Sequence, residues 1–267
     1  TIQNRTNDQP VFEVVSGGKL TLTDCKNNNK GKVTRAYNSH GGGVEVNGGE
    51  FNLYSGSITK NTADNGGVYV YNSGEFNMYG GSITLNTAAK GGGVYVGSYG
   101  QSGTFHMYGG KITNNTGTQY GGGVYVYEGT FDMDDGEISG NKTNGPGGGV
   151  RVSRMNCVFT MRGGEIRDNT ASSGGGVSVV DDGVFTMSGG SITKNKTTGT
   201  GGGVSMNRGG KFTVSGTAVI KDNKKGSADN NVYLLNNKFI TVSGHLDDGA
   251  SIGVTTDKTP DAGGTIP

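Results

Sequence analysis

Apolar residues recur along this chain in a pattern that repeats every 24 to 30 residues. The stretch 91–116, GGGVYVGSYGQSGTFHMYGGKITNNT, holds one copy: a Val-x-Val pair, a Phe-x-Met pair, and a single Ile followed three residues later by Asn. Residues two apart lie on the same face of a β-strand. The pattern therefore predicts three short strands per repeat, each with one apolar face, separated by glycine-rich corners.

One residue type returns at each position of the repeat. The first valine recurs at Val44, Val68, Val94, Val124, Val150, Val177, Val204 and Val232. The aromatic residue recurs at Phe51, Phe76, Phe105, Phe131, Phe159, Phe185 and Phe212. The isoleucine recurs at Ile58, Ile83, Ile112, Ile138, Ile166, Ile192 and Ile220, and the asparagine at Asn61, Asn86, Asn115, Asn141, Asn169, Asn195 and Asn223. Such columns indicate that successive repeats stack directly on one another.

This repetition predicts an all-β fold, a single-stranded right-handed parallel β-helix of about nine coils, with 24 to 30 residues and three short strands per coil. No single repeat could bury its apolar face alone, so stacking is required. A helical fold is disfavoured because two or three consecutive glycines stand in every repeat, and each costs about 1 kcal/mol against alanine in a helix. A right-handed path agrees with the general rule for parallel crossovers.

The regularity of the pattern sets the expected domain boundaries. We expect a β-helix at 1–252, with a degenerate first coil at 1–40, regular coils at 41–223 and an irregular last coil at 224–252. An irregular end coil protects a strand edge from pairing with another molecule. Residues 253–267 are expected to be a tail or linker. Because Thr1 begins in what looks like the end of a strand, we expect the chain to be a processed or excised piece of a longer protein.

Composition alone would suggest disorder, since 54 of 267 residues are glycine and only 31% are hydrophobic. The fixed register outweighs that indication, because a β-helix core is one side chain deep. The 23 basic residues nearly balance the 22 acidic ones. No polybasic run favours nucleic acid or an anionic membrane surface. No apolar stretch reaches the roughly 18 residues of a transmembrane helix, so we expect no membrane insertion of this segment.

The pairing of GGGV with I-x-x-N, as in GGGVYV and ITNN, resembles the GGA-I and F-x-x-N repeats of chlamydial polymorphic outer-membrane proteins and related β-helix repeats of large bacterial surface proteins. The terminal NVYL and ITVSGHLDDGASIGVTT are similar to the closing coil of such proteins in Gram-positive and anaerobic gut bacteria. The resemblance covers nearly the whole chain. It implies an extracellular or cell-surface location, often in adhesins, and it transfers no catalytic residue.

Candidate catalytic residues come from one acidic strip, Asp132, Asp134, Glu137 and Glu165. The pectin lyase and polygalacturonase families share the β-helix fold, and a glycosidase needs two carboxylates about 5 to 10 Å apart. The alternative is a solvated strip of ion pairs, with Asp134 opposite Arg162. We favour the ion pairs, because the sequence motifs of polygalacturonases are absent and fold alone does not fix function.

The sequence indicates no cofactor and no metal site. His40, His106 and His245 fall in different coils, too scattered for a zinc shell. The Asp181-Asp182-Gly183 and Asp247-Asp248-Gly249 segments are typical of turns and could at most hold a weak surface Ca²⁺.

Cysteine and asparagine both suggest structural roles. Cys25 and Cys157 belong to the first and sixth coils, so five rises of about 4.8 Å separate them and no disulfide is expected. We interpret the asparagine column as structural too, since stacked amides at a corner can satisfy backbone groups and one another.

The distribution of tyrosine is the one feature that the fold does not require. Eleven of the 12 tyrosines lie between Tyr37 and Tyr127. Two outward ladders are predicted, one made of Tyr54, Tyr79 and Tyr108 and the other of Tyr69, Tyr95 and Tyr125. Cross-strand aromatic pairs stabilise a sheet by up to roughly 1 kcal/mol each, so the ladders could be structural, or they could form a binding surface.

Three functions remain open on the sequence alone. The first is a non-enzymatic, adhesin-like module that binds a glycan or a host protein through the tyrosines. The second is a carbohydrate-active enzyme, a polysaccharide lyase or glycoside hydrolase, that uses the acidic strip. The third is a passive stalk that holds another domain away from the cell wall.

Overall fold

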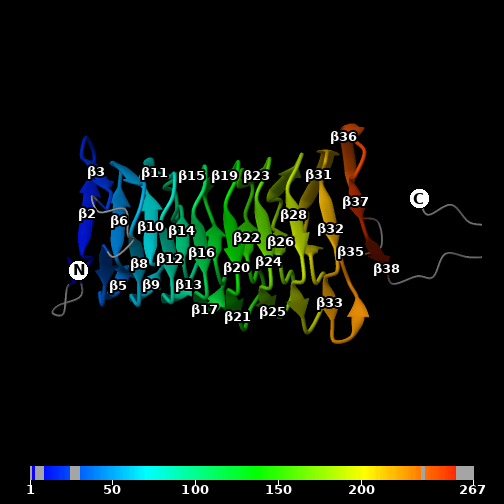
Figure 1. Ribbon diagram of the computed structural model, residues 1–267, viewed down its shortest axis with the longest axis horizontal. Coiled ribbons are helices and arrows are strands. Elements are labelled where there is room, and N and C mark those ends of the chain that lie inside the picture. Colours follow the sequence, from blue (N-terminus) through cyan, green and yellow to red (C-terminus); the bar gives the residue numbers. More distant parts are fainter. Residues whose placement is uncertain (1, 4–8, 25–30, 236–237, 257–267) are drawn as a thin grey trace, which may run out of the picture.

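The structure is a computed structural model that describes residues 2–3, 9–24, 31–235 and 238–256. It is all-β, with 38 strands and no helix among the described residues. The strands form a parallel β-helix of about eight turns, close to the nine predicted. The strands β2 (Phe12–Val15) and β38 (Val254–Thr256) lie at opposite ends of the long axis (Figure 1).

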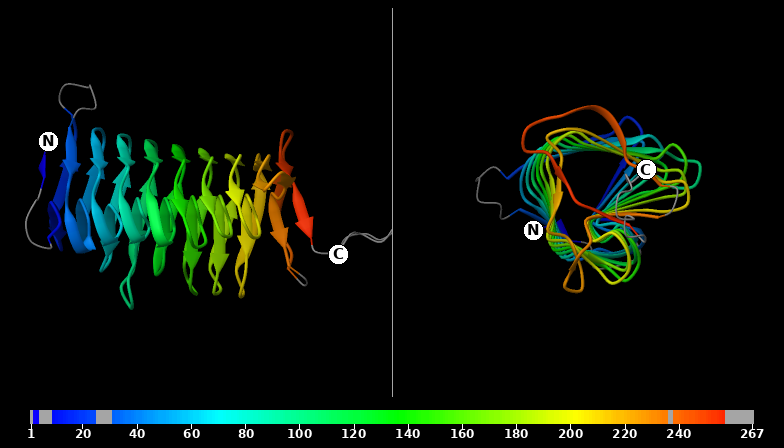
Figure 2. Two further views of the ribbon diagram at one scale, coloured as in Figure 1. Left: turned by 90° about the horizontal axis from the view of Figure 1, so that it is seen from below. Right: turned by 90° about the vertical axis from the view of Figure 1, so that its right-hand side faces the viewer.

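Four sheets run along this axis, and the coils superimpose closely when they are viewed down it (Figure 2). The valine sheet contains β2, β6 (Val44–Asn47), β10 (Val68–Tyr71), β14 (Val94–Val96), β18 (Val124–Val126), β22 (Val150–Ser153), β26 (Val177–Val180), β30 (Val204–Met206), β35 (Val232–Leu234) and β38. The phenylalanine sheet contains β3 (Lys19–Leu22), β7 (Glu50–Leu53), β11 (Gly74–Met78), β15 (Gly103–Met107), β19 (Gly129–Met133), β23 (Val158–Met161), β27 (Val184–Met187), β31 (Lys211–Gly216) and β36 (Thr241–Leu246).

The other two sheets complete each coil. The isoleucine sheet contains β1 (Ile2–Gln3), β4 (Lys32–Thr34), β8 (Ser57–Thr59), β12 (Ser82–Thr84), β16 (Lys111–Thr113), β20 (Glu137–Ser139), β24 (Glu165–Arg167), β28 (Ser191–Thr193), β32 (Val219–Lys221) and β37 (Ser251–Ile252). The fourth sheet contains β5 (Tyr37–Gly41), β9 (Thr62–Asn65), β13 (Thr87–Lys90), β17 (Thr116–Tyr120), β21 (Lys142–Thr143), β25 (Thr170–Ala171), β29 (Lys196–Thr197), β33 (Lys224–Lys225) and β34 (Ala228–Asp229). The antiparallel pairing of β33 with β34 ends this last sheet.

The fourth sheet corrects the prediction of three strands per coil. Its strands follow the asparagine column and carry the chain back to the glycine corner. From β9 to β29, each of these strands has a single small buried residue, such as Ala63, Ala88 or Ala171. The sequence pattern missed these strands because a single small residue gives no apolar pair to detect.

The core consists of the predicted columns. Strand partners carry the same residue type, as in Val68 opposite Val94 and Ile83 opposite Ile112. The seven phenylalanine rings form one stack, with neighbouring centroids 4.6 to 4.9 Å apart. Stacked aromatic pairs add about 0.5–1.5 kcal/mol each beyond the burial of their surface. The inward assignment of these columns is confirmed.

The C-terminal boundary of the β-helix lies further along the chain than expected. Val254, Tyr233 and their neighbours pair β38 with β35, so strand pairing continues to Thr256. Residues 254–256, which were predicted to belong to a tail beginning at residue 253, therefore form part of the last coil. Residues 257–267 lie outside the described residues. Cys25 also lies outside them.

Candidate functional site

The acidic strip is a set of ion pairs. The guanidinium group of Arg162 donates to Asp132 at 3.2 Å and to Asp134 at 3.0 Å. One coil apart in the isoleucine sheet, Glu137 and Glu165 are strand partners, and both bond to Arg167. The predicted pairing of Asp134 with Arg162 is confirmed.

Glu137 has an environment that favours its charged form. Lys111 Nζ lies 2.8 Å from its Oε2, and the Ser139 hydroxyl donates to Oε1 at 2.6 Å. The hydrogen bonds from Lys111 and Ser139 and the charge of Arg167 hold the pKa of Glu137 below its ordinary value, against the opposing effect of burial. A general acid in a glycosidase needs the opposite shift, a raised pKa.

Three tyrosines form an exposed row that we call the tyrosine ridge: Tyr54, Tyr79 and Tyr108. Each follows the last residue of a strand in the phenylalanine sheet, and they are 50%, 42% and 43% exposed. Their ring centroids lie 4.6 and 4.9 Å apart and the planes are within 11° of parallel. In this stack the rings support one another and stay partly exposed to solvent. The first predicted ladder is therefore present.

The second predicted ladder is not exposed. Tyr69, Tyr95 and Tyr125, the tyrosine row, do project from the outer face of the valine sheet, but each is only 3–4% exposed. Tyr71 stacks on Tyr69 at 4.4 Å, and Tyr127 packs against the row from the same side. Strand alternation fixes which face of the sheet a residue occupies, but here neighbouring side chains cover that face.

Side chains from the fourth sheet also cover the tyrosine row. Lys90 Nζ lies 6.0 Å from the ring centroid of Tyr95, and the ring of Tyr120 lies 6.0 Å from that of Tyr125. Burial raises the pKa of Tyr95 well above the ordinary phenol value, and burial also raises the pKa of Tyr125. These phenols stay neutral at physiological pH and belong to the packing of the protein.

Opposite charges stand at the two ends of the tyrosine row. Glu45 is the strand partner of Tyr69, and Arg151 is the strand partner of Tyr125. Glu45 is buried and accepts a hydrogen bond from the Tyr71 hydroxyl at 2.7 Å. The Arg151 guanidinium lies over the rings of Tyr120 at 4.4 Å and Tyr125 at 5.6 Å.

A hollow begins where the tyrosine row ends. The next positions in register after Arg151 are Ser178 and Ser205, which are far smaller than tyrosine. The space left on this face of the valine sheet has a volume of about 460 Å³. We call it the arginine hollow, and its lining comes from three parts of the coil. Arg151 and Ser178 lie in strands of the valine sheet and form its floor, Tyr120 and Ser173 precede strands of this sheet, and Asp181 and Arg208 follow them on the other side. Sequence reasoning did not find it, although the in-register change from tyrosine to serine was its signal.

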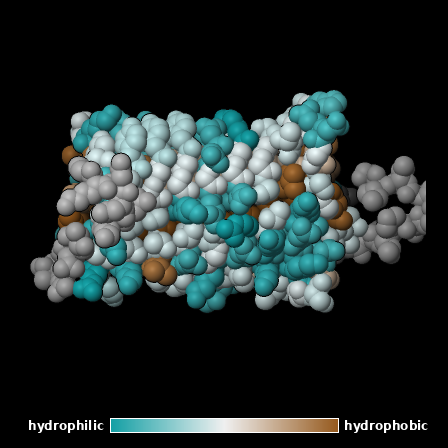
Figure 3. All heavy atoms as spheres, viewed as in Figure 1, coloured by the Kyte–Doolittle hydropathy of each residue, from teal (hydrophilic) through white to brown (hydrophobic). Residues whose placement is uncertain are grey.

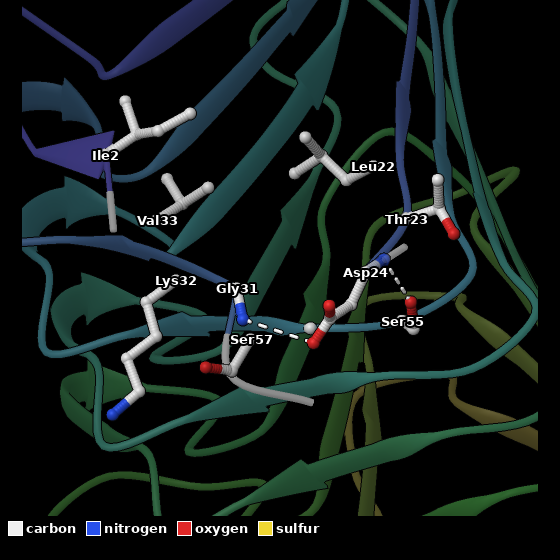
Figure 4. Close-up of a pocket in the computed structure, with 10 residues that line it drawn as sticks. Ile2, Leu22, Thr23, Asp24, Gly31, Lys32, Val33, Ser55 and Ser57 are labelled. Atoms are coloured by element: carbon white, nitrogen blue, oxygen red, sulfur yellow. Dashed lines mark hydrogen bonds between the residues drawn. The ribbon is translucent and has the colours of Figure 1, made fainter. Parts of the chain in front are cut away.

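Another cavity lies at the N-terminal end of the β-helix and has a volume of about 170 Å³. Figure 4 shows Ile2, Leu22 and Val33 on one side of it, and Asp24, which accepts a hydrogen bond from the backbone of Gly31. Residues 25–30, between two of its lining segments, are outside the described part of the chain.

The remaining surface gives little indication of function. On the face shown in Figure 3, hydrophobic residues appear only in small separate areas. Among the described residues, no cluster of three or more His, Cys, Asp or Glu side chains could hold a metal, and no helix could cross a membrane. Asp181 and Asp182 both have positive φ, as expected for turn residues.

Comparisons with protein-family models, curated proteins and solved structures found no match for this chain. The parallel β-helix is thus established by the structure itself. The resemblance to bacterial surface repeats stays a prediction.

Proposed function

We propose that this protein is a non-enzymatic binding module of a bacterial cell surface and that it binds an extended glycan along the tyrosine ridge. The observation that carries the proposal is the exposed stack of Tyr54, Tyr79 and Tyr108 on adjacent coils. Surface tyrosines that only stabilised strand pairing would be equally useful in every coil. In later coils, however, the same position holds Asp134, Arg162, Ser188 and Ser215.

The chemistry of the ridge suits a carbohydrate. Each tyrosine offers a partly exposed apolar ring and a hydroxyl that can donate and accept, which complements the apolar faces and hydroxyls of sugars. Stacking already restricts the rings, so binding would cost little additional side-chain entropy. A row of side chains at regular spacing also matches a ligand that is itself a repeating chain.

The ion pairs of the acidic strip support a binding module over an enzyme. Both Asp132 and Asp134 are held by Arg162, and the pKa of Glu137 is lowered. The lowered pKa of Glu137 is the opposite of the raised pKa that protonation of a leaving group requires. The passive stalk remains the alternative if no ligand is found.

The proposal can be tested with a triple variant, Tyr54→Ser, Tyr79→Ser and Tyr108→Ser. Serine is chosen because Ser188 and Ser215 occupy the same column in later coils, so the scaffold tolerates it. The wild type is screened on an array of neutral and acidic oligosaccharides, and the binding of any captured glycan is then measured. We expect the triple variant to keep its β-sheet spectrum and to bind at least about tenfold more weakly, since loss of contact area and hydrogen bonds reaches that size.

The control is Tyr37→Ser, which removes an 80% exposed tyrosine outside the ridge. Its affinity should equal that of the wild type. Undiminished binding by the triple variant would refute the ridge as the site. Release of new reducing ends or unsaturated sugars would favour an enzyme, capture of a host protein without any glycan would change the ligand class, and failure to capture any ligand would favour a stalk.

A further inference from the structure

Arg151 is a partly buried arginine without an ion pair among the described residues. No carboxylate of the described residues lies within 4 Å of its guanidinium nitrogens, whereas Arg162 and Arg167 are both ion-paired. Its Nε and Nη1 atoms are shielded from solvent and have no hydrogen-bond partner among the described residues. The group is held in place by the rings of Tyr120 and Tyr125. Its positive charge is therefore fixed in position and unneutralised.

Ser178 adds a second unsatisfied group on the same floor. Its neighbours Val177 and Val179 point into the core, so its own side chain points outward into the arginine hollow. The residue is only 1% exposed, and its Oγ has no partner in the described part of the protein. A buried polar group without a partner destabilises a protein, so these two strand partners mark this part of the valine sheet as polar and unsatisfied.

The other residues that line the hollow indicate what kind of ligand would bind there. Ser173 lies on one side, and its hydroxyl already bonds to Ser205 at 2.9 Å. On the other side Asp181 accepts from Ser153 at 3.2 Å and lies 3.9 Å from Arg208. With two arginines and one aspartate, the lining carries a net positive charge together with several hydroxyls. A volume of about 460 Å³ is in the range of small-molecule sites.

We propose that the arginine hollow binds a hydroxylated carboxylate, an acidic sugar residue, with its carboxylate on Arg151 and its hydroxyls toward the serines. The planar guanidinium group is suited to carboxylate recognition, and its charge strengthens each hydrogen bond. The hollow lies on the outer face of the valine sheet and the tyrosine ridge follows the strands of the phenylalanine sheet, so this site does not depend on the function proposed for the ridge.

The first test compares two sugars that differ only in the group at one carbon. D-glucuronate carries a carboxylate where D-glucose carries a hydroxymethyl group, and binding of each to the full chain is followed by ligand-observed NMR. We expect D-glucuronate to bind at least about tenfold more tightly than D-glucose. Equal affinity for the two sugars, or no binding of either, would overturn the inference. Tighter binding of inorganic sulfate than of D-glucuronate would show an oxyanion site without sugar recognition and would also overturn it.

Two variants then locate the binding. Arg151→Gln removes the charge and should weaken D-glucuronate binding about tenfold or more, whereas Arg162→Gln removes an equal charge from the acidic strip and should leave it unchanged. Ser178→Tyr restores the residue type that fills the same column at Tyr125 and should block the hollow while keeping Arg151. Because Tyr69, Tyr95 and Tyr125 fit at this position in other coils, the blocked protein should fold even if Arg151→Gln does not. Full binding by Ser178→Tyr would place the ligand elsewhere and refute the site.

Discussion

Asn115 bonds to Asn141 of the next coil through both its backbone and its side chain. The backbone N–H of Asn115 donates to Asn141 Oδ1 at 2.9 Å, and Asn115 Nδ2 donates to the same oxygen at 3.0 Å. The second hydrogen of Nδ2 goes to the carbonyl of Ile83 in the preceding coil, at 2.9 Å. The same arrangement repeats from Asn61 to Asn223, so this column forms a continuous buried chain of amides.

Asn115→Ala should therefore be among the most destabilising changes in the chain. Asn86 would lose the acceptor of both its backbone N–H and its Nδ2, and the carbonyl of Ile83 would lose a donor. At about 1–3 kcal/mol for each unsatisfied buried group, we expect a loss of about 3 kcal/mol or more in the free energy of unfolding. Denaturant titration measures it. The adjacent Asn114 is exposed and has positive φ, so Asn114→Gly is the control; equal losses for both variants would contradict the structural role.

A single methyl group at Gly122 should disturb the stacking of two coils. A Cβ at this position would lie 2.5 Å from the carbonyl oxygen of Gly148 and 2.8 Å from backbone atoms of Lys142. Backbone atoms cannot rotate away as a side chain does, so Gly122→Ala should cost about 2 kcal/mol or more. At Gly31 a Cβ would meet nothing within 4 Å, and Gly31→Ala should change stability by no more than about 1 kcal/mol. The melting temperatures of the two variants test this prediction. A Gly122→Ala protein as stable as Gly31→Ala would contradict the close contact between Gly122 and the backbone of the next coil.

Glu137 should contribute stability that depends on pH. Its pKa in the folded protein is lowered from 4.5, chiefly by the hydrogen bond from Lys111, so its contribution is present above that pH and is lost as pH falls through the folded-state pKa. Glu137→Gln should be less stable than the wild type by about 1 kcal/mol at neutral pH. This difference in the free energy of unfolding should disappear in acid. Melting curves across this pH range test it, with exposed Asp64→Asn as the control; a gap that widened in acid would reverse the assigned sign.

Cys157 should not react with thiol reagents while the protein is folded. Its Sγ is fully buried among core residues, bonds to the carbonyl oxygens of Tyr127 and Ser153, and forms no disulfide within the described chain. Burial raises the pKa of this thiol to about 11, so the reactive thiolate is scarce. In a Cys25→Ser variant, 5,5′-dithiobis(2-nitrobenzoate) should label the remaining thiol only after unfolding. Rapid labelling of the native protein would mean that the core around Phe159 opens readily.

The core of the β-helix could be predicted from the sequence because its information is repeated in every coil. Phe76 and Phe105 are strand partners for the same reason that they occupy one column: a side chain of one shape packs best on its own copy. The fourth sheet escaped prediction because residues such as Ala88 bury a side chain too small to mark a strand face. A repeated sequence pattern identifies columns of large side chains, but it does not identify strands whose buried residue is as small as alanine.

The candidate sites were only partly predictable, for a different reason. Tyr79 and Tyr95 both alternate with core residues, and the sequence placed both on the surface. Tyr95 is nevertheless covered by Tyr127, which follows strand β18 of the next coil, and by Lys90, which ends strand β13 of the fourth sheet. The arginine hollow depends on the same property, because the side chains that border Arg151 come from several coils. Alternation gives the side of a strand on which a residue lies, whereas tertiary packing decides whether water reaches it.

The direction of the hydrogen bonds between coils determines how the molecule would respond to mechanical force. Because the strands run around the axis, the bonds that join one coil to the next point along it, and the two ends of the described chain lie at opposite ends of that axis (Figure 1). Tension between the ends would act on all the stacked interfaces in series, so the weakest would open first and the coils would detach one after another. Each coil of 24 to 30 residues would release about 90 Å of extended chain. Single-molecule stretching should therefore give a series of evenly spaced, similar rupture steps, as expected of a tether that lengthens in stages under load.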